Sequence, residues 1–118
     1  ERENNNTNQH QKYSNINNQS REWIEKLLKT PIEDFRKNAT NLILAPYFIN
    51  IEKLSYQESF NILIEWLKRC ESIRKLDFNP MSVTKSALNI ATQKKIPPMK
   101  LETLRNRNSE IYQILQKL

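Results

Sequence analysis

Residues 55–73, SYQESFNILIEWLKRCESI, decide the fold of this 118-residue chain. Ser55, followed three positions later by Glu58, has the form of a capping box, which marks a helix start. The apolar side chains behind it lie three or four positions apart, which is the period of one helix face. They are Tyr56, Phe60, Leu63, Leu67 and Cys70, and the stripe is widened by Ile62, Trp66 and Ile73. We therefore expect a central helix in which Trp66 and Cys70 face the core.

The residues before this stretch predict two more helices. An apolar pattern over residues 23–28 indicates a short amphipathic helix. Thr30 and Pro31, with Glu33 completing a second capping box, predict that the next helix begins at Pro31. We expect this helix to continue to about Ala45, where a proline follows, and the apolar residues after it to be irregular.

The residues after the central helix continue the same pattern. Asn79 is a cap and Pro80 a first helical residue, so a helix is expected to begin there. Its predicted inner face consists of Val83, Ala87, Ile90 and Ala91. Two prolines at 97–98 separate it from a C-terminal segment, in which Ser109 is the expected cap of a last helix. The fold class predicted is all-α, a small bundle of five or six short helices.

The chain divides into a tail and one domain. Ten of the first twenty residues are Asn or Gln, and few are apolar, so we expect residues 1–20 to be a disordered linker or tail. Residues 21–118 are expected to form the helical bundle. Because the chain begins with Glu, we interpret it as a piece of a longer protein.

The composition excludes several classes of function. The chain has no glycine, so it has neither a P-loop nor a dinucleotide-binding fingerprint. One cysteine excludes a disulfide framework, a zinc finger and an iron–sulfur cluster. The adjacent carboxylates Glu33 and Asp34 are explained by a helix start, and no catalytic or metal site can be assembled. No apolar run is long enough to span a membrane, and we expect a cytoplasmic, monomeric and non-catalytic domain.

The charge indicates a polyanionic partner. Lys and Arg number 19 and Asp and Glu 13, which gives a net charge of +6. Residues 78–109 hold six basic residues and one acidic residue, a local excess of +5. Such an excess attracts nucleic acid, although a solubilising surface would have the same composition.

Candidate phosphate-binding residues lie at two places. Arg36 and Lys37 lie about one turn into the helix predicted after Thr30, and Lys37 and Asn41 are i, i+4 neighbours on its polar side. Arg74 and Lys75 precede the Asn79 cap, where exposed N–H groups of the next helix are expected to favour an anion. Two aromatic residues near these polar positions, Tyr47 and Phe78, are the candidates for stacking on bases.

Three strings resemble a known family. They are LILAPYFINIEKLSYQESFNILIEWLKRC (42–70), RKLDFNP (74–80) and PMKLETLRNRNSEIYQIL (98–115). Together they resemble the helix-bundle module of archaeal primases. The relatives include the non-catalytic subunit PriX, the bundle of plasmid primase–polymerases of archaea, and the C-terminal domain of primase large subunits without its iron–sulfur cluster.

The resemblance implies a non-catalytic accessory domain. Such a bundle holds the single-stranded DNA template and the triphosphate of the initiating nucleotide, which is ATP or another nucleoside triphosphate, with or without Mg²⁺. It presents both to a catalytic primase–polymerase domain in the same or another chain. The expected nucleotide-binding residues are Arg36, Lys37, Asn41, Tyr47, Asn50 and Arg74. The expected DNA-binding residues are Asp77, Phe78, Asn79, Lys85, Lys94, Lys95, Lys100 and Arg105. The resemblance also places Asp34, together with Arg36, Lys37 and Asn41, in the family's motif on the second helix, whereas Asn38 departs from that motif, which has a basic residue there.

Two other classes remain open from the sequence. A helix-turn-helix protein would use the helix over residues 83–94 to read duplex DNA. A protein–protein adaptor bundle would carry its charge incidentally and would not bind DNA.

Overall fold

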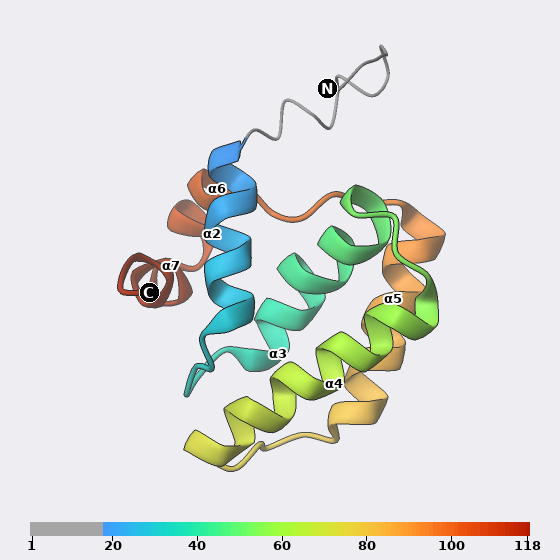
Figure 1. The fold of residues 1–118 in the computed structure, drawn as a ribbon. Coiled ribbons are helices and arrows are strands. Elements are labelled where there is room, and N and C mark those ends of the chain that lie inside the picture. The colour runs from blue at the N-terminus through green and yellow to red at the C-terminus, as the bar shows by residue number, and fades with distance from the viewer. Residues whose placement is uncertain (1–17) are drawn as a thin grey trace.

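The computed structural model describes residues 18–118, and the regular secondary structure of this part of the chain is entirely helical, with no strand (Figure 1). The all-α prediction is therefore confirmed. Its elements are α2 (Asn18–Lys29), α3 (Arg36–Ala39), the π-helical turns η1 (Thr40–Leu44) and η2 (Tyr47–Ile51), α4 (Tyr56–Ile73), α5 (Pro80–Lys94), α6 (Leu101–Arg107) and α7 (Ser109–Gln116). α2 begins three residues before the expected start of the domain at residue 21. Residues 1–17 of the tail that was predicted to be disordered lie outside the described residues.

The helices form a bundle around the segment from α3 to η2 (Figure 1). α5 packs against α4 and against both π-helical turns, and α2 packs against η1. α6 and α7 contact each other and lie beside α2. The connection after α5 crosses the bundle to reach α6.

The sequence predicts α4 as the central helix, but the segment from α3 to η2 occupies the centre, and α4 packs beside it against α5 and η2. Trp66 is fully buried, and its indole N–H donates to the carbonyl of Leu27, 2.9 Å away, which attaches α4 to α2. Cys70 is also buried, which confirms its prediction as a core residue.

The predicted core is wrong at three positions. Tyr56 and Ile73 of α4 are 40% and 50% exposed, and Ile90 of α5 is 42% exposed. The buried face of α5 is formed by Thr84, Ala87, Leu88 and Ala91.

The second helix begins later than expected. α3 starts at Arg36, and Thr30, Pro31 and Glu33 precede it in an irregular segment, so the capping box predicted there is wrong. Ile32 is buried in this segment, and its N–H donates to the sulfur of Cys70. Tertiary burial of Ile32 has therefore prevailed over a local helix-start signal.

The helical segment that begins with α3 also ends later than expected. It continues through Pro46 to Ile51, so the irregular passage predicted after Ala45 is wrong. A proline inside a helix removes one N–H and crowds the carbonyl four residues earlier. Here that carbonyl belongs to Leu42, and it accepts the N–H of Met99 at 2.9 Å, so the connection to α6 supplies the missing donor.

Helix starts depend on neighbouring residues. Ser55 and Glu58 form the predicted capping box, and Asn79 caps α5 in front of Pro80. The expected cap of α7 is displaced by one position, because the side chain of Asn108, not Ser109, accepts the N–H of Ile111.

Helix ends depend on distant residues. In most proteins a glycine often ends a helix in the left-handed conformation. This chain has none. Lys95, at the end of α5, and Lys53, two residues after η2, adopt positive φ angles of 52° and 58°, and Phe35, which precedes the start of α3, has a φ of 61°. The carbonyls at the ends of α2, α4 and α5 accept hydrogen bonds from side chains that lie 34 to 46 positions away in the sequence.

Candidate phosphate-binding pocket

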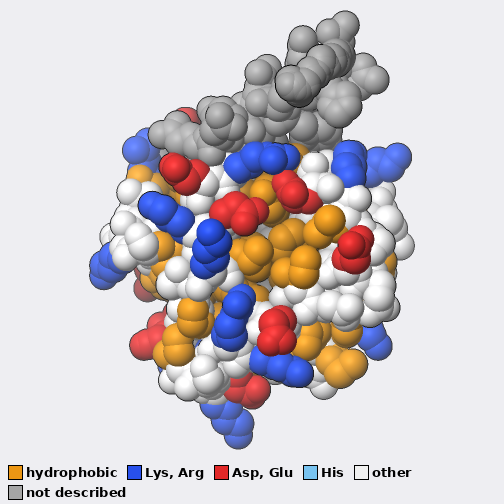
Figure 2. Space-filling model, in the orientation of Figure 1, with side chains coloured by type: hydrophobic (Ala, Val, Ile, Leu, Met, Phe, Trp, Pro, Cys, Tyr) orange, Lys and Arg blue, Asp and Glu red, His pale blue; other side chains and the backbone are white. Residues whose placement is uncertain are grey.

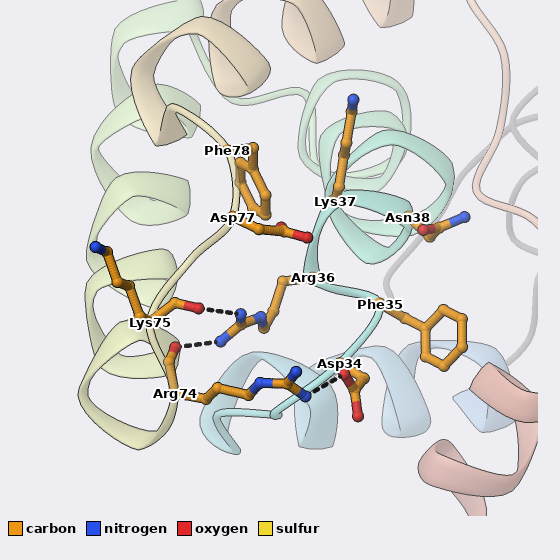
Figure 3. Close-up of a pocket in the computed structure, with 9 residues that line it drawn as sticks. All are labelled: Asp34, Phe35, Arg36, Lys37, Asn38, Arg74, Lys75, Asp77 and Phe78. Carbon is orange, nitrogen blue, oxygen red and sulfur yellow. Dashed lines mark hydrogen bonds and ion pairs between the residues drawn. The ribbon is translucent and has the colours of Figure 1, made fainter.

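A pocket of about 240 Å³ lies between the segment that opens α3 and the connection from α4 to α5 (Figure 3). Four basic and two acidic side chains line it, together with three uncharged ones. The lining residues are Asp34, Phe35, Arg36, Lys37, Asn38, Arg74, Lys75, Asp77 and Phe78. The two candidate phosphate-binding segments, which are separate in the sequence, thus form one site.

Arg36 forms the floor between the two segments. Its guanidinium donates to the carbonyls of Cys70 (3.2 Å), Arg74 (2.6 Å) and Lys75 (3.0 Å), and the residue is only 6% exposed. A guanidinium has five N–H donors, so these bonds occupy most of them. Arg36 therefore fixes the end of α4 and the course of the connection that forms the opposite wall.

Arg74 lies at the mouth of the pocket. One of its guanidinium nitrogens is 2.8 Å from a carboxylate oxygen of Asp34, and both side chains are more than half exposed. The sequence predicts that Arg74 binds phosphate, but it explains Asp34 as an acidic residue that interacts favourably with the dipole of a helix beginning at Pro31. Because α3 begins at Arg36, that assignment is wrong, and no local signal would have paired residues 40 positions apart.

The remaining polar side chains differ in direction (Figure 3). Lys37 is exposed and has no ion-pair partner among the described residues, and Asp77 points into the space between the two segments. Lys75 points away from that space. Phe78 is half-buried and forms part of the wall, as an aromatic candidate for stacking requires.

The sequence predicts free N–H groups at the start of α5, but these groups are hydrogen-bonded to Asn79. The side-chain oxygen of Asn79 accepts from Met81 at 2.9 Å and from Ser82 at 3.1 Å, and its carbonyl accepts from Val83. Pro80 has no N–H. The first turn of α5 therefore has its donors satisfied by Asn79, and the prediction that they bind an anion is wrong.

Three of the expected nucleotide-binding residues lie outside the pocket. Tyr47 is buried, which corrects its interpretation as a stacking residue, and its hydroxyl donates to Glu25 at 2.8 Å. Burial and this hydrogen bond raise the pKa of Tyr47 well above its usual value. Asn50 is buried and donates to the carbonyls of Ala91 (3.1 Å) and Ile96 (2.6 Å) at the end of α5. Asn41 is partly buried in η1.

The expected DNA-binding lysines and arginine are all exposed, but they divide between the two ends of α5. Lys85 is near the pocket end, whereas Lys94 and Lys95 are at the other end, next to the connection that leads to Lys100 and Arg105 of α6. Nine residues at 100° each place Lys85 and Lys94 on opposite sides of the helix. On the face drawn in Figure 2, basic and acidic side chains alternate around apolar ones.

Across residues 18–118, Cys, Asp and Glu do not gather in groups of three or more that could hold a metal ion. No helix in the same range has the length and apolarity needed to cross a membrane.

The fold is a small helical domain, and its pocket is lined by more basic than acidic side chains. Residues 10–118 match the Primase X (PriX) family, and the chain belongs to this family. This membership gives the chain a primase-related role and makes it part of a primase system. No curated protein matches the sequence at a significant level.

Proposed function

We propose that this chain is a non-catalytic primase module that binds a single-stranded DNA template and the triphosphate of the initiating nucleotide. It presents both to the catalytic domain of the primase. Family membership supports the primase context, and the pocket between Asp34–Asn38 and Arg74–Phe78 is the observation that carries the proposal.

The pocket suits a polyphosphate for three reasons. Its basic side chains outnumber its acidic ones by two, and Lys37 and Arg74 are exposed and so available to a ligand. Arginine binds phosphate through two parallel hydrogen bonds, and lysine supplies a mobile charge. Asp77 points into the same space, where its carboxylate would hold a Mg²⁺ ion that accompanies the triphosphate.

This arrangement would help a primase begin a strand. The first bond joins two free nucleotides that no primer holds in place. A module that holds one nucleotide and the template near the catalytic domain makes the step effectively intramolecular, which lowers the barrier by up to several kcal/mol.

The nucleotide site is tested by calorimetric titration with ATP and with inorganic triphosphate. We expect Lys37→Ala and Arg74→Ala each to weaken binding roughly tenfold, near the low end of the range for hydrogen bonds to charged groups. Lys68→Ala is the matched control, because Lys68 is exposed on α4 and does not line the pocket. Equal affinities for all four proteins would contradict the site.

The template site is tested by fluorescence anisotropy of a labelled single strand over a salt series. We expect Lys94, Lys95, Lys100 and Arg105 to contact the strand, with Lys85 as a separate contact at the pocket end. Each neutralised phosphate contributes about −0.7 to the log–log slope, so three or four contacts give roughly −2 to −3. Lys94→Ala with Lys95→Ala should flatten the slope by about one.

Other outcomes would favour the alternatives. Tighter binding to duplex than to single strands would favour a helix-turn-helix protein. A slope near zero for both forms of DNA would favour a protein–protein adaptor.

A further inference from the structure

The acidic partner of the Arg74 guanidinium is the carboxylate of Asp34. Asp34 lies 2.8 Å from the Arg74 guanidinium across the pocket mouth (Figure 3). We propose that Asp34 is a built-in competitor, which occupies on Arg74 the position that a ligand phosphate takes. This inference rests on the proposed phosphate site and concerns its regulation.

Of the four basic residues of the pocket, Arg74 is the one whose availability to a ligand depends on an acidic partner. Arg36 is buried and donates to three main-chain carbonyls, so it has little capacity for a ligand. Lys75 points away from the space between the segments. Lys37 and Arg74 remain, and of these Arg74 alone has an acidic partner among the described residues.

The exchange of Asp34 for a phosphate is physically easy. The Arg74 and Asp34 side chains are 60% and 54% exposed, and ion pairs this exposed contribute little to stability. Asp34 also lies in the irregular segment before α3, where no helical hydrogen bonds hold it in place. A phosphate presents the guanidinium with the same pair of oxygens as a carboxylate and carries more charge.

The pair also lowers the affinity for a ligand. A phosphate must first displace the Asp34 carboxylate from the Arg74 guanidinium, so the free energy of the ion pair is subtracted from the free energy of binding. The pocket therefore binds polyphosphate more weakly than its basic residues alone would allow. Such a site releases its nucleotide readily, as a module that passes a nucleotide to another domain requires.

The test measures the affinity for inorganic triphosphate, without Mg²⁺, of wild type and two single variants. Asp34→Asn removes the competitor and should tighten binding about two- to fivefold beyond the control, which is the usual range for an exposed pair. The control is Glu33→Gln, which removes the same charge from the neighbouring exposed residue. Glu33 does not line the pocket, and it pairs with no basic residue in the described part of the chain.

A double-mutant cycle assigns the effect to Arg74. In an Arg74→Ala background, Asp34→Asn should tighten binding no more than Glu33→Gln does. The proposal is overturned if Asp34→Asn equals the control in the wild-type background, if its extra effect persists without Arg74, or if it weakens binding.

The same measurements separate this proposal from the phosphate site itself. If wild type binds triphosphate through Lys37 but Asp34→Asn matches Glu33→Gln, the site stands and the competitor falls. If neither wild type nor Asp34→Asn binds triphosphate, both proposals fail. If only Asp34→Asn binds, the competitor is stronger than an exposed pair suggests, and both proposals are supported.

Discussion

Arg36 shows how one residue can support a site without pointing into it. The sequence identified it as a basic residue near other basic residues, and it does lie at the pocket. Its guanidinium, however, is directed at carbonyls of Cys70, Arg74 and Lys75. The phosphate contact remains a prediction, while the bonds to the end of α4 give Arg36 a structural role that its sequence position did not reveal.

Replacing Arg36 should destabilise the fold. We expect Arg36→Ala to lower the free energy of unfolding by about 3 kcal/mol, because three main-chain carbonyls lose a charged donor. The bond to Cys70 is buried, and the bonds to Arg74 and Lys75 are partly buried. Urea denaturation followed by circular dichroism measures the change. Lys37→Ala, which changes the neighbouring exposed residue, should change the free energy of unfolding by less than about 0.5 kcal/mol. Equal losses of stability in the two variants would contradict the structural role of Arg36.

Tyr47 should make stability depend on alkaline pH. Burial and the bond to Glu25 raise its pKa in the folded state, so the folded state holds the phenol proton more tightly than the unfolded state. This contribution is complete below the unfolded pKa of about 10 and is lost as the pH rises above it.

The test compares the free energy of unfolding between about pH 9 and pH 11. Tyr47→Phe should show a smaller loss over this range than wild type. Tyr56→Phe, which changes an exposed tyrosine, should lose as much as wild type. The same loss in Tyr47→Phe and wild type would show that the phenol is not the group responsible.

At the scale of elements, the sequence predicts helix starts better than helix ends. Ser55 and Asn79 were found because a capping side chain and the N–H groups it accepts from are neighbours in sequence. Thr30 has the same pattern but caps no helix, since the burial of Ile32 determines the path there. The end of α5 depends on Asn50, which is 41 positions from Ala91, and no local pattern reveals such a pair.

Asn50 should matter mainly for the last turn of α5. We expect Asn50→Ala to lower the free energy of unfolding by about 2 kcal/mol, because the carbonyls of Ala91 and Ile96 lose a buried donor. Hydrogen exchange should show faster exchange of the Lys95 amide, which bonds to the same Ala91 carbonyl. Asn89→Ala, at an exposed position of α5, is the control and should leave both quantities nearly unchanged.

At the scale of the whole molecule, these long-range bonds predict a single cooperative transition. Cys70 reports on it, because its thiol is buried and its pKa is raised by burial, so it should react only when α4 leaves the core. The free energy measured by thiol labelling should therefore equal the one measured by denaturation.

The control for this measurement is an exposed thiol. Lys68→Cys in a Cys70→Ser background should label at the rate of a free thiol, since Lys68 is exposed on the same helix. A labelling free energy for Cys70 well below that of denaturation would reveal a local opening of α4 and would contradict the cooperative unit.

The contrast between local starts and distant ends of the helices also sets an order in time. Ser55 and Asn79 can cap α4 and α5 as soon as those turns form, because their partners are adjacent. The last turns must wait until Arg36 and Asn50 arrive from other parts of the chain. Each helix should thus grow from its N-terminal turn and become fixed at its far end late, after the slower closure of loops of 34 or more residues.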